Sequence, residues 1–187
     1  LSDYADAAAA QVDTDASLLE LAAADLRQLN RRYPVEAGAP ARFLLLHRER
    51  RFSQTEQRWI GWERKRGKLE QLLGFLLDPA VAPFIDQGEL SRPAPGTPYV
   101  VTLDSDTRLP PGSLRELVGV AAHPLNQPHL DPQRRRVTAG YGILQPRVVT
   151  PLPRPEALTP FHWLFAGQCG LDPYSTASSE VYQDLFG

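Results

Sequence analysis

Methionine is absent from this sequence, and cysteine occurs once, as Cys169. A single cysteine excludes an intrachain disulfide framework and fits a reducing compartment. We interpret Cys169 as a small apolar packing residue without a catalytic role. Because no initiator methionine is present and the chain opens abruptly on LSDYADA, we expect a piece of a longer protein.

Long hydrophobic runs and a strong charge of either sign are missing as well. No apolar run approaches the roughly 20 residues that a membrane-spanning helix needs, and neither a signal peptide nor a lipidation motif is visible. The 20 Lys and Arg residues nearly balance the 22 Asp and Glu residues, which leaves a net charge of −2. Such a charge does not call for nucleic acid or an anionic membrane, so we expect neither as a partner of this chain.

What is present is an alternation of helical and strand-like segments. Residues 13–33 predict an amphipathic helix, with Ser17 and Glu20 as a capping box, and its apolar face is expected to comprise Leu18, Ala22, Leu26, Leu29 and Tyr33. The other predicted elements are a buried strand at 42–48, a helix over most of 53–77, a proline-rich loop at 79–98, a buried strand at 99–103, a helix at 110–124, a polar connection at 125–136, one or two strands at 137–149 and a short helix at 160–167.

Short apolar strands that alternate with helices predict an α/β fold with a mostly parallel sheet covered by helices. The length of 187 residues fits one domain, residues 1–187. In such sheets, ligands gather at the carboxyl ends of the strands. Residues that directly follow a predicted strand are therefore the first candidates for a site.

Two carboxylates, Asp104 and Asp106, follow the strand predicted at 99–103. Side chains at i and i+2 of an extended chain point the same way, and paired carboxylates repel unless a cation or a proton intervenes. Mg²⁺ and Mn²⁺ prefer oxygen ligands and often bind one or two carboxylates together with substrate phosphates. One interpretation of the pair is a metal site that holds a diphosphate. The other is a turn and helix cap without a ligand, since Asp is common at such positions.

Residues 48–68 are rich in positive charge. One interpretation is a solvated helical face with i,i+4 ion pairs, and the other is a cationic wall for a phosphate-bearing ligand. Gly67 within KRGK favours the second, because glycine lets a ligand approach closely. Trp59 and Trp62 are interpreted as helix packing. The eight basic residues are Arg48, Arg50, Arg51, Arg58, Arg64, Lys65, Arg66 and Lys68, and the four histidines, interpreted as structural or exposed, are His47, His123, His129 and His162.

Long strings of the sequence resemble the glycosyltransferase region of cyclic β-1,2-glucan synthases, which are large bacterial inner-membrane enzymes that polymerise glucose from UDP-glucose. The resemblance covers nearly the whole chain, and a looser one extends to processive synthases of the cellulose-synthase type. It implies a partial glycosyltransferase A fold at the cytoplasmic face of the inner membrane. The parent would be membrane-embedded, although this chain itself need not contact the membrane. The strings are RFLLLHRERRFSQTEQRWIGWERKRGKLEQL, YVVTLDSDTRLPPGSLRELVGVAAHPLNQPHLDP, GYGILQPRVVTPLP and FAGQCGLDPYSTASSEVYQDLFG.

The looser resemblance implies roles for individual residues at the donor site. SDYAD resembles the strand end where an aspartate meets the uridine, which implies Asp3, or else Asp6, as a nucleotide contact. KRGKLE resembles the family's Lys-Ala-Gly-Asn-Leu-Asn stretch and matches it at Lys65, Gly67 and Leu69. Lys65 and Gly67 thereby inherit a donor-site role, whereas the sequence departs from the family at Arg66, Lys68 and Glu70.

The same resemblance covers the metal, the acceptor and the reaction. Asp104 and Asp106 match the pair that binds Mg²⁺ or Mn²⁺, and Asp104 is also expected to contact the donor nucleotide sugar. ILQPRV implies that Gln145 and Arg147 lie near the acceptor channel. The implied reaction is a metal-dependent, inverting transfer of glucose from UDP-glucose to a growing glucan. The family's general base and acceptor motif would fall beyond Gly187, so we expect the isolated chain to bind nucleotide weakly and to transfer no sugar.

Two other interpretations stay open. A phosphatase of the haloacid dehalogenase type also places Asp-x-Asp after an apolar strand, but it requires Thr or Val two places beyond the second aspartate, where this sequence has Arg108. A non-catalytic structural segment, whose aspartates cap a turn, requires no ligand.

Overall fold

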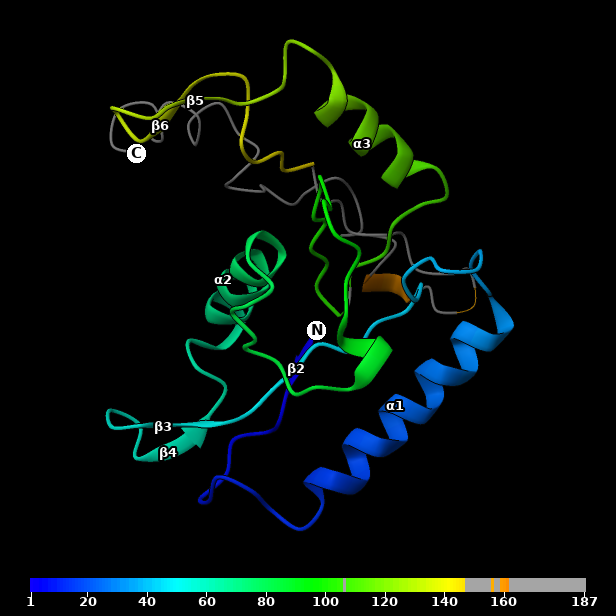
Figure 1. Cartoon of the computed structure of the whole chain (residues 1–187), viewed down its shortest axis with the longest axis vertical. Coiled ribbons are helices and arrows are strands. Elements are labelled where there is room, and N and C mark those ends of the chain that lie inside the picture. The colour runs from blue at the N-terminus through cyan, green and yellow to red at the C-terminus, as the bar shows by residue number, and fades with distance from the viewer. Residues whose placement is uncertain (106, 147–155, 157–158, 162–187) are drawn as a thin grey trace. The chain divides into compact units, whose positions relative to one another are not determined.

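The computed structural model describes residues 1–105, 107–146, 156 and 159–161 (Figure 1). The chain divides into two compact units, Leu1–Thr102 and Leu103–Gly187. The described elements of the first unit are β1, α1, β2, β3, β4, α2 and the 3-10 helix η1, and those of the second are α3, β5 and β6.

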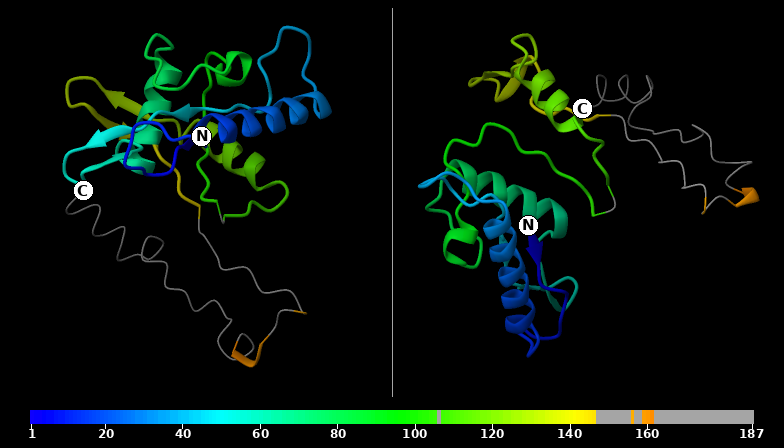
Figure 2. Two further views of the ribbon diagram at one scale, coloured as in Figure 1. Left: turned by 90° about the horizontal axis from the view of Figure 1, so that it is seen from below. Right: turned by 90° about the vertical axis from the view of Figure 1, so that its right-hand side faces the viewer.

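A parallel β-α-β arrangement opens the first unit. β1 (Ser2–Asp3) pairs with β2 (His47–Arg48), with Ser2 opposite His47 and Asp3 opposite Arg48, and α1 (Asp15–Arg32) connects them. Parallel strands need a crossover connection, usually a helix, and α1 runs alongside the strand pair in Figures 1 and 2. The helix predicted at 13–33 is confirmed, and the strand predicted at 42–48 is confirmed in its last two residues.

The apolar face of α1 differs in part from the prediction. Leu18 is 58% exposed, and its neighbour Leu19 packs on the core in its place. The predicted capping box is wrong: since the helix begins at Asp15, Ser17 lies inside the first turn, where its Oγ donates to the Thr14 carbonyl oxygen at 2.9 Å. Among the described residues, one buried apolar cluster comprises Ala23, Leu45 and Leu90, with Leu19, Ala22 and Leu26 packed against them.

The helix predicted over 53–77 is correct only from residue 64 onward. The first part is an antiparallel hairpin of β3 (Arg51–Ser53) and β4 (Arg58–Ile60), and the helix α2 (Arg64–Leu77) follows. Phe52 and Trp59 face each other across the hairpin with ring centroids 5.7 Å apart, a cross-strand aromatic pair that stabilises it. Trp59 therefore packs from a strand, and the helix packing predicted for it is wrong.

The predicted proline-rich loop covers the second edge of β2. The Ile85 N–H donates to the His47 carbonyl oxygen at 2.8 Å, and the Leu45 N–H donates to the Leu90 carbonyl oxygen at 2.7 Å. The 3-10 helix η1 (Gly88–Ser91) carries Leu90 into the core. Leu45 and His47 are both buried, and these bonds satisfy backbone groups at buried positions.

In the second unit, α3 (Ser113–Ala122) confirms the helix predicted at 110–124. β5 (His129–Asp131) pairs antiparallel with β6 (Arg136–Ala139). The predicted connection at 125–136 thus contains a strand, because the Asp131 carboxylate accepts the N–H groups of Gln133 and Arg134 and closes a hairpin turn.

The buried strand predicted at 99–103 is wrong for this structure. No described residue pairs with this segment as a strand, and Tyr99, Val101 and Leu103 are 39%, 43% and 49% exposed. Within the described ranges β1–β2 is the one parallel ladder, so the mostly parallel glycosyltransferase A sheet, like the single domain, stays a prediction. No helix in those ranges is long and apolar enough to span a bilayer.

Candidate functional site

Asp3 lies at the carboxyl end of the parallel strand pair, in contact with two cations. Arg48, the last residue of β2, donates from Nε to Asp3 Oδ1 at 2.6 Å. Lys68, on α2, places its Nζ 2.9 Å from Asp3 Oδ2. Each carboxylate oxygen therefore faces one positive charge, and we call these three residues the Asp3 cluster.

Arg48 ties β2 to α2 as well as to β1. Its Nη1 donates to Gln71 Oε1 at 2.7 Å, and its Nη2 donates to the Arg64 carbonyl oxygen at 3.1 Å. The Arg48 side chain is only 2% exposed. All three nitrogens of this buried guanidinium have protein acceptors, so Arg48 is fixed in place.

The Asp3 carboxylate is ionised at neutral pH. Burial alone would raise the pKa of Asp3, but the hydrogen bonds from Arg48 and Lys68 outweigh it and hold the pKa below its usual value. A Cβ at Gly61 would stand 2.8 Å from Asp3 Cγ, so the turn between β4 and α2 approaches the carboxylate this closely only with glycine there.

Gly67 and Lys65, the residues matched to the family's donor-site stretch, lie in the first turn of α2. A side chain at Gly67 would collide with the Trp62 carbonyl oxygen and stand 2.7 Å from Glu63 Cβ. Close packing against Trp62 thus explains the glycine without a ligand, and its donor-site role stays a prediction. Lys65 is exposed.

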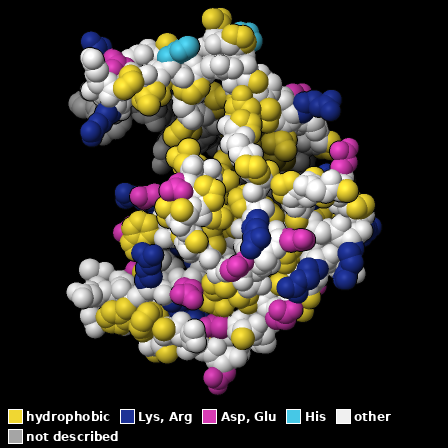
Figure 3. Space-filling model, in the orientation of Figure 1, with side chains coloured by type: hydrophobic (Ala, Val, Ile, Leu, Met, Phe, Trp, Pro, Cys, Tyr) yellow, Lys and Arg dark blue, Asp and Glu magenta, His cyan; other side chains and the backbone are white. Residues whose placement is uncertain are grey.

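Several cations of the basic segment are paired with carboxylates. Arg64 contacts Asp6 at 3.0 Å and Glu56 at 2.6 Å. Asp6, the alternative nucleotide contact, is thus paired with Arg64 and is not part of the Asp3 cluster. Figure 3 shows Lys and Arg interspersed with Asp and Glu on the visible face of the Leu1–Thr102 unit. These ion pairs join residues distant in the sequence rather than i,i+4 neighbours of one helix, so the predicted solvated helical face is wrong in this form, and a cationic wall for a phosphate-bearing ligand stays a prediction.

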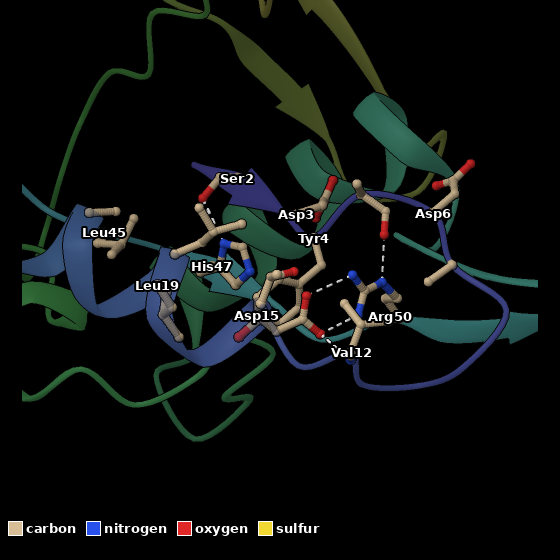
Figure 4. A pocket seen from close by; sticks show the side chains of 15 residues that line it. Ser2, Asp3, Tyr4, Asp6, Val12, Asp15, Leu19, Leu45, His47 and Arg50 are labelled. Atoms are coloured by element: carbon tan, nitrogen blue, oxygen red, sulfur yellow. Dashed lines mark hydrogen bonds and ion pairs between the residues drawn. The ribbon is translucent and has the colours of Figure 1, made fainter.

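A pocket of about 380 Å³ lies beside the Asp3 cluster, between the strand pair and α1 (Figure 4). His47 contributes a buried imidazole whose Nδ1 lies 2.8 Å from Ser2 Oγ. The Tyr4 ring meets this imidazole edge-on, with centroids 4.1 Å apart. His47 Nε2 is buried and has no protein hydrogen-bond partner. His47 is thus buried, and the structural role expected for it stays a prediction.

Arg50 and Asp15 close the other side of the pocket, as Figure 4 shows. Their two hydrogen bonds measure 2.5 and 2.9 Å, and Arg50 Nε donates to the Ala5 carbonyl oxygen at 2.6 Å. The hydrogen bonds from Arg50 outweigh the burial of Asp15 and lower the pKa of that carboxyl group. This pair anchors the segment between β1 and α1.

Because His47 is buried, we expect the free energy of unfolding to fall as the pH is lowered from neutral. Burial lowers the pKa of His47 below its ordinary value of 6.5. As the pH falls below about 6.5, the unfolded chain binds a proton before the folded chain does, so the free energy of unfolding decreases until the folded pKa is passed. Urea unfolding between pH 7.5 and pH 5.5 should show this decrease.

In this pH range, the variant His47→Gln should have a flatter profile than the wild type, because glutamine retains a partner for Ser2 but does not titrate. The matched control is His129→Gln, which removes an exposed histidine and should leave the slope unchanged. An identical slope in wild type and His47→Gln would contradict the role assigned to this buried imidazole.

Asp104 belongs to the second unit and opens a turn. Its side chain is exposed, and its carbonyl oxygen accepts the Thr107 N–H at 3.0 Å. Asp106 and Arg147 lie outside the described residues, and Gln145 is exposed. No group of three or more His, Cys, Asp or Glu in the described ranges forms a metal site. The donor chemistry of Asp104 and Asp106, two carboxylates, still fits Mg²⁺ or Mn²⁺ completed by phosphate oxygens.

The sequence did not reveal that Arg48 and Lys68 contact Asp3. Lys68 is noticeable only as a departure from the family pattern. Arg48 carries one local signal: it is the charged residue that ends the strand predicted at 42–48, as Asp3 ends β1. The contact itself joins residues 45 positions apart and depends on the parallel pairing.

Comparison with known proteins shows which protein this chain is similar to. No model of a known protein family matches it. It is 41% identical over all 187 residues to the cyclic β-(1,2)-glucan synthase NdvB of Rhizobium meliloti (strain 1021), and it spans 6% of the length of that protein. The resemblance predicted from the sequence is confirmed: over its whole length, the chain is a relative of one segment of a cyclic β-1,2-glucan synthase.

Proposed function

We propose that the chain is part of the donor-binding region of a glycosyltransferase that builds a β-1,2-glucan, with UDP-glucose as donor. The observation that carries this proposal is the 41% identity along the whole chain to a protein named as a cyclic β-(1,2)-glucan synthase. Building a glucan requires glycosyl transfer to a glucan acceptor. The parent would work at the cytoplasmic face of the bacterial inner membrane.

The β-α-β arrangement of the first unit supports the position of the donor site. Open α/β sheets bind ligands at the carboxyl ends of their strands, and Asp3 is the last residue of β1. Because the pKa of Asp3 is lowered, its carboxylate is an ionised acceptor at neutral pH. Such an acceptor suits the N–H of a uracil ring.

The diphosphate of the donor requires positive charge. Asp104 and Asp106 would hold Mg²⁺ or Mn²⁺, which when bound neutralises charge on the departing diphosphate. Lys65 and Gly67 are proposed to line the donor side, and Gln145 and Arg147 the acceptor side. The acceptor hydroxyl attacks the anomeric carbon with inversion as UDP leaves, through an oxocarbenium-like transition state. A general base deprotonates that hydroxyl, and we assign it to no residue of this chain.

A nucleotide panel tests the proposal. The melting temperature of the chain is measured in Mn²⁺ with UDP, UDP-glucose, ADP or GDP, each at one fixed concentration. A ligand at ten times its Kd stabilises the folded state by about 1.4 kcal/mol, or a few degrees in Tm. We expect this shift for UDP and UDP-glucose and a smaller one for ADP and GDP. Equal shifts for all four nucleotides, or none, would contradict a uridine-specific donor site.

A further inference from the structure

The two cations of the Asp3 cluster are held very differently. Arg48 is 2% exposed and donates to Asp3, Gln71 and the Arg64 carbonyl oxygen. Removing it from Asp3 would break a network that joins β1, β2 and α2. Arg48 is therefore a permanent partner of Asp3 Oδ1.

The Lys68 side chain is more exposed than that of Arg48. The Lys68 side chain is 23% exposed, and its ammonium group meets Asp3 Oδ2 at 2.9 Å from the second turn of α2. A lysine ammonium is a point charge on a flexible stem with three donors, so it can move to another anion without a change in the backbone. Oδ2 of Asp3 is thus the carboxylate oxygen that can change partners.

The charges of the cluster are unequal. One carboxylate, Asp3, faces two cations, Arg48 and Lys68, so one positive charge is not balanced within the cluster. Arg64, on the same helix, shows the opposite balance, because it contacts two carboxylates, Asp6 and Glu56. An anion that arrives beside Asp3 would therefore pair with Lys68 rather than with Arg64.

We propose that Lys68 is an exchangeable cation that couples recognition of the base to recognition of the diphosphate. It pairs with Asp3 until a nucleoside diphosphate binds. The N–H of the base then takes its place on Asp3 Oδ2, and the ammonium group passes to a phosphate oxygen. This inference rests on the proposed function, in which Asp3 contacts the uridine, and it adds a diphosphate-binding residue at a position where the sequence departs from the family pattern.

Calorimetry with two ligands tests the exchange. Uridine carries the base without the diphosphate and UDP carries both, and each is titrated into wild type, Lys68→Gln and Lys68→Met at constant Mn²⁺. Loss of one charge-assisted hydrogen bond should weaken UDP binding about tenfold in both variants. Uridine binding should be unchanged or tighter, because Asp3 Oδ2 no longer has a competing cation. Lys68→Arg, which keeps the charge, should stay close to wild type.

A charge-matched control and the wild-type affinities distinguish failure of the Lys68 inference from failure of the proposed function. Arg31→Gln removes an exposed cation of α1 and should leave both affinities unchanged. Equal losses of uridine and UDP affinity in the Lys68 variants would indicate a structural role and overturn the inference, as would unchanged UDP affinity; both results leave the proposed function intact. If wild type binds neither uridine nor UDP, the proposed function and the inference fall together.

Discussion

Replacing Arg48 with methionine should destabilise the chain by about 3 kcal/mol or more, the cost of removing one partner of a buried ion pair. The substitution leaves Asp3 Oδ1, Gln71 and the Arg64 carbonyl oxygen without their donor at a site where the Arg48 side chain is 2% exposed. Methionine retains much of the apolar volume, so the effect reports on hydrogen bonds and charge. Urea unfolding at neutral pH measures the change.

Two further variants test whether the loss of stability comes from the buried ion pair. Arg31→Met, which removes an exposed arginine of α1, should change the free energy of unfolding by less than about 0.5 kcal/mol. Combining Arg48→Met with Asp3→Leu should recover part of the loss, because no carboxylate then remains buried without Arg48. A loss below about 1 kcal/mol in Arg48→Met would place the pair among ordinary surface ion pairs and contradict its role as the link between β1, β2 and α2.

Replacing Asp104 with alanine should remove the metal-dependent part of UDP binding. If Asp104 is a ligand of Mn²⁺, the variant should bind UDP at least about tenfold more weakly in Mn²⁺ than wild type, as expected for the loss of a charged contact. Because the Asp104 side chain is exposed, the melting temperature without ligand should not change. Calorimetry with and without Mn²⁺ measures both affinities.

The control for this variant is Asp25→Ala, which removes an exposed carboxylate of α1 and should retain the full effect of Mn²⁺. If Asp104→Ala responds to Mn²⁺ as strongly as wild type, the aspartate pair is a turn and helix cap, and a metal role for Asp104 is wrong.

The helices were the most predictable part of this fold. α1 and α3 follow from local features, namely apolar periodicity and flanking Pro34, Pro110 and Pro124, and both were predicted close to their observed bounds. The β3–β4 hairpin was missed because its strands have three residues each. Such short strands give too few alternations to outweigh the neighbouring helical pattern.

Strands and site contacts depend on distant residues, and there the sequence was a weaker guide. Residues 99–103 have strand-like composition, yet a strand forms only where a neighbour supplies hydrogen bonds. Asp3 entered as a candidate through family resemblance alone. Its partners, Arg48 and Lys68, follow from the parallel β1–β2 pairing and from the position of α2, neither of which a local pattern encodes.

A crystal structure of the chain grown with UDP and Mn²⁺ tests the proposed donor site most directly. We expect the uracil N–H within hydrogen-bond distance of an Asp3 carboxylate oxygen and the metal ion bound by both Asp104 and Asp106 against the diphosphate. UDP bound away from Asp3, or the two aspartate side chains facing apart with no metal between them, would contradict it.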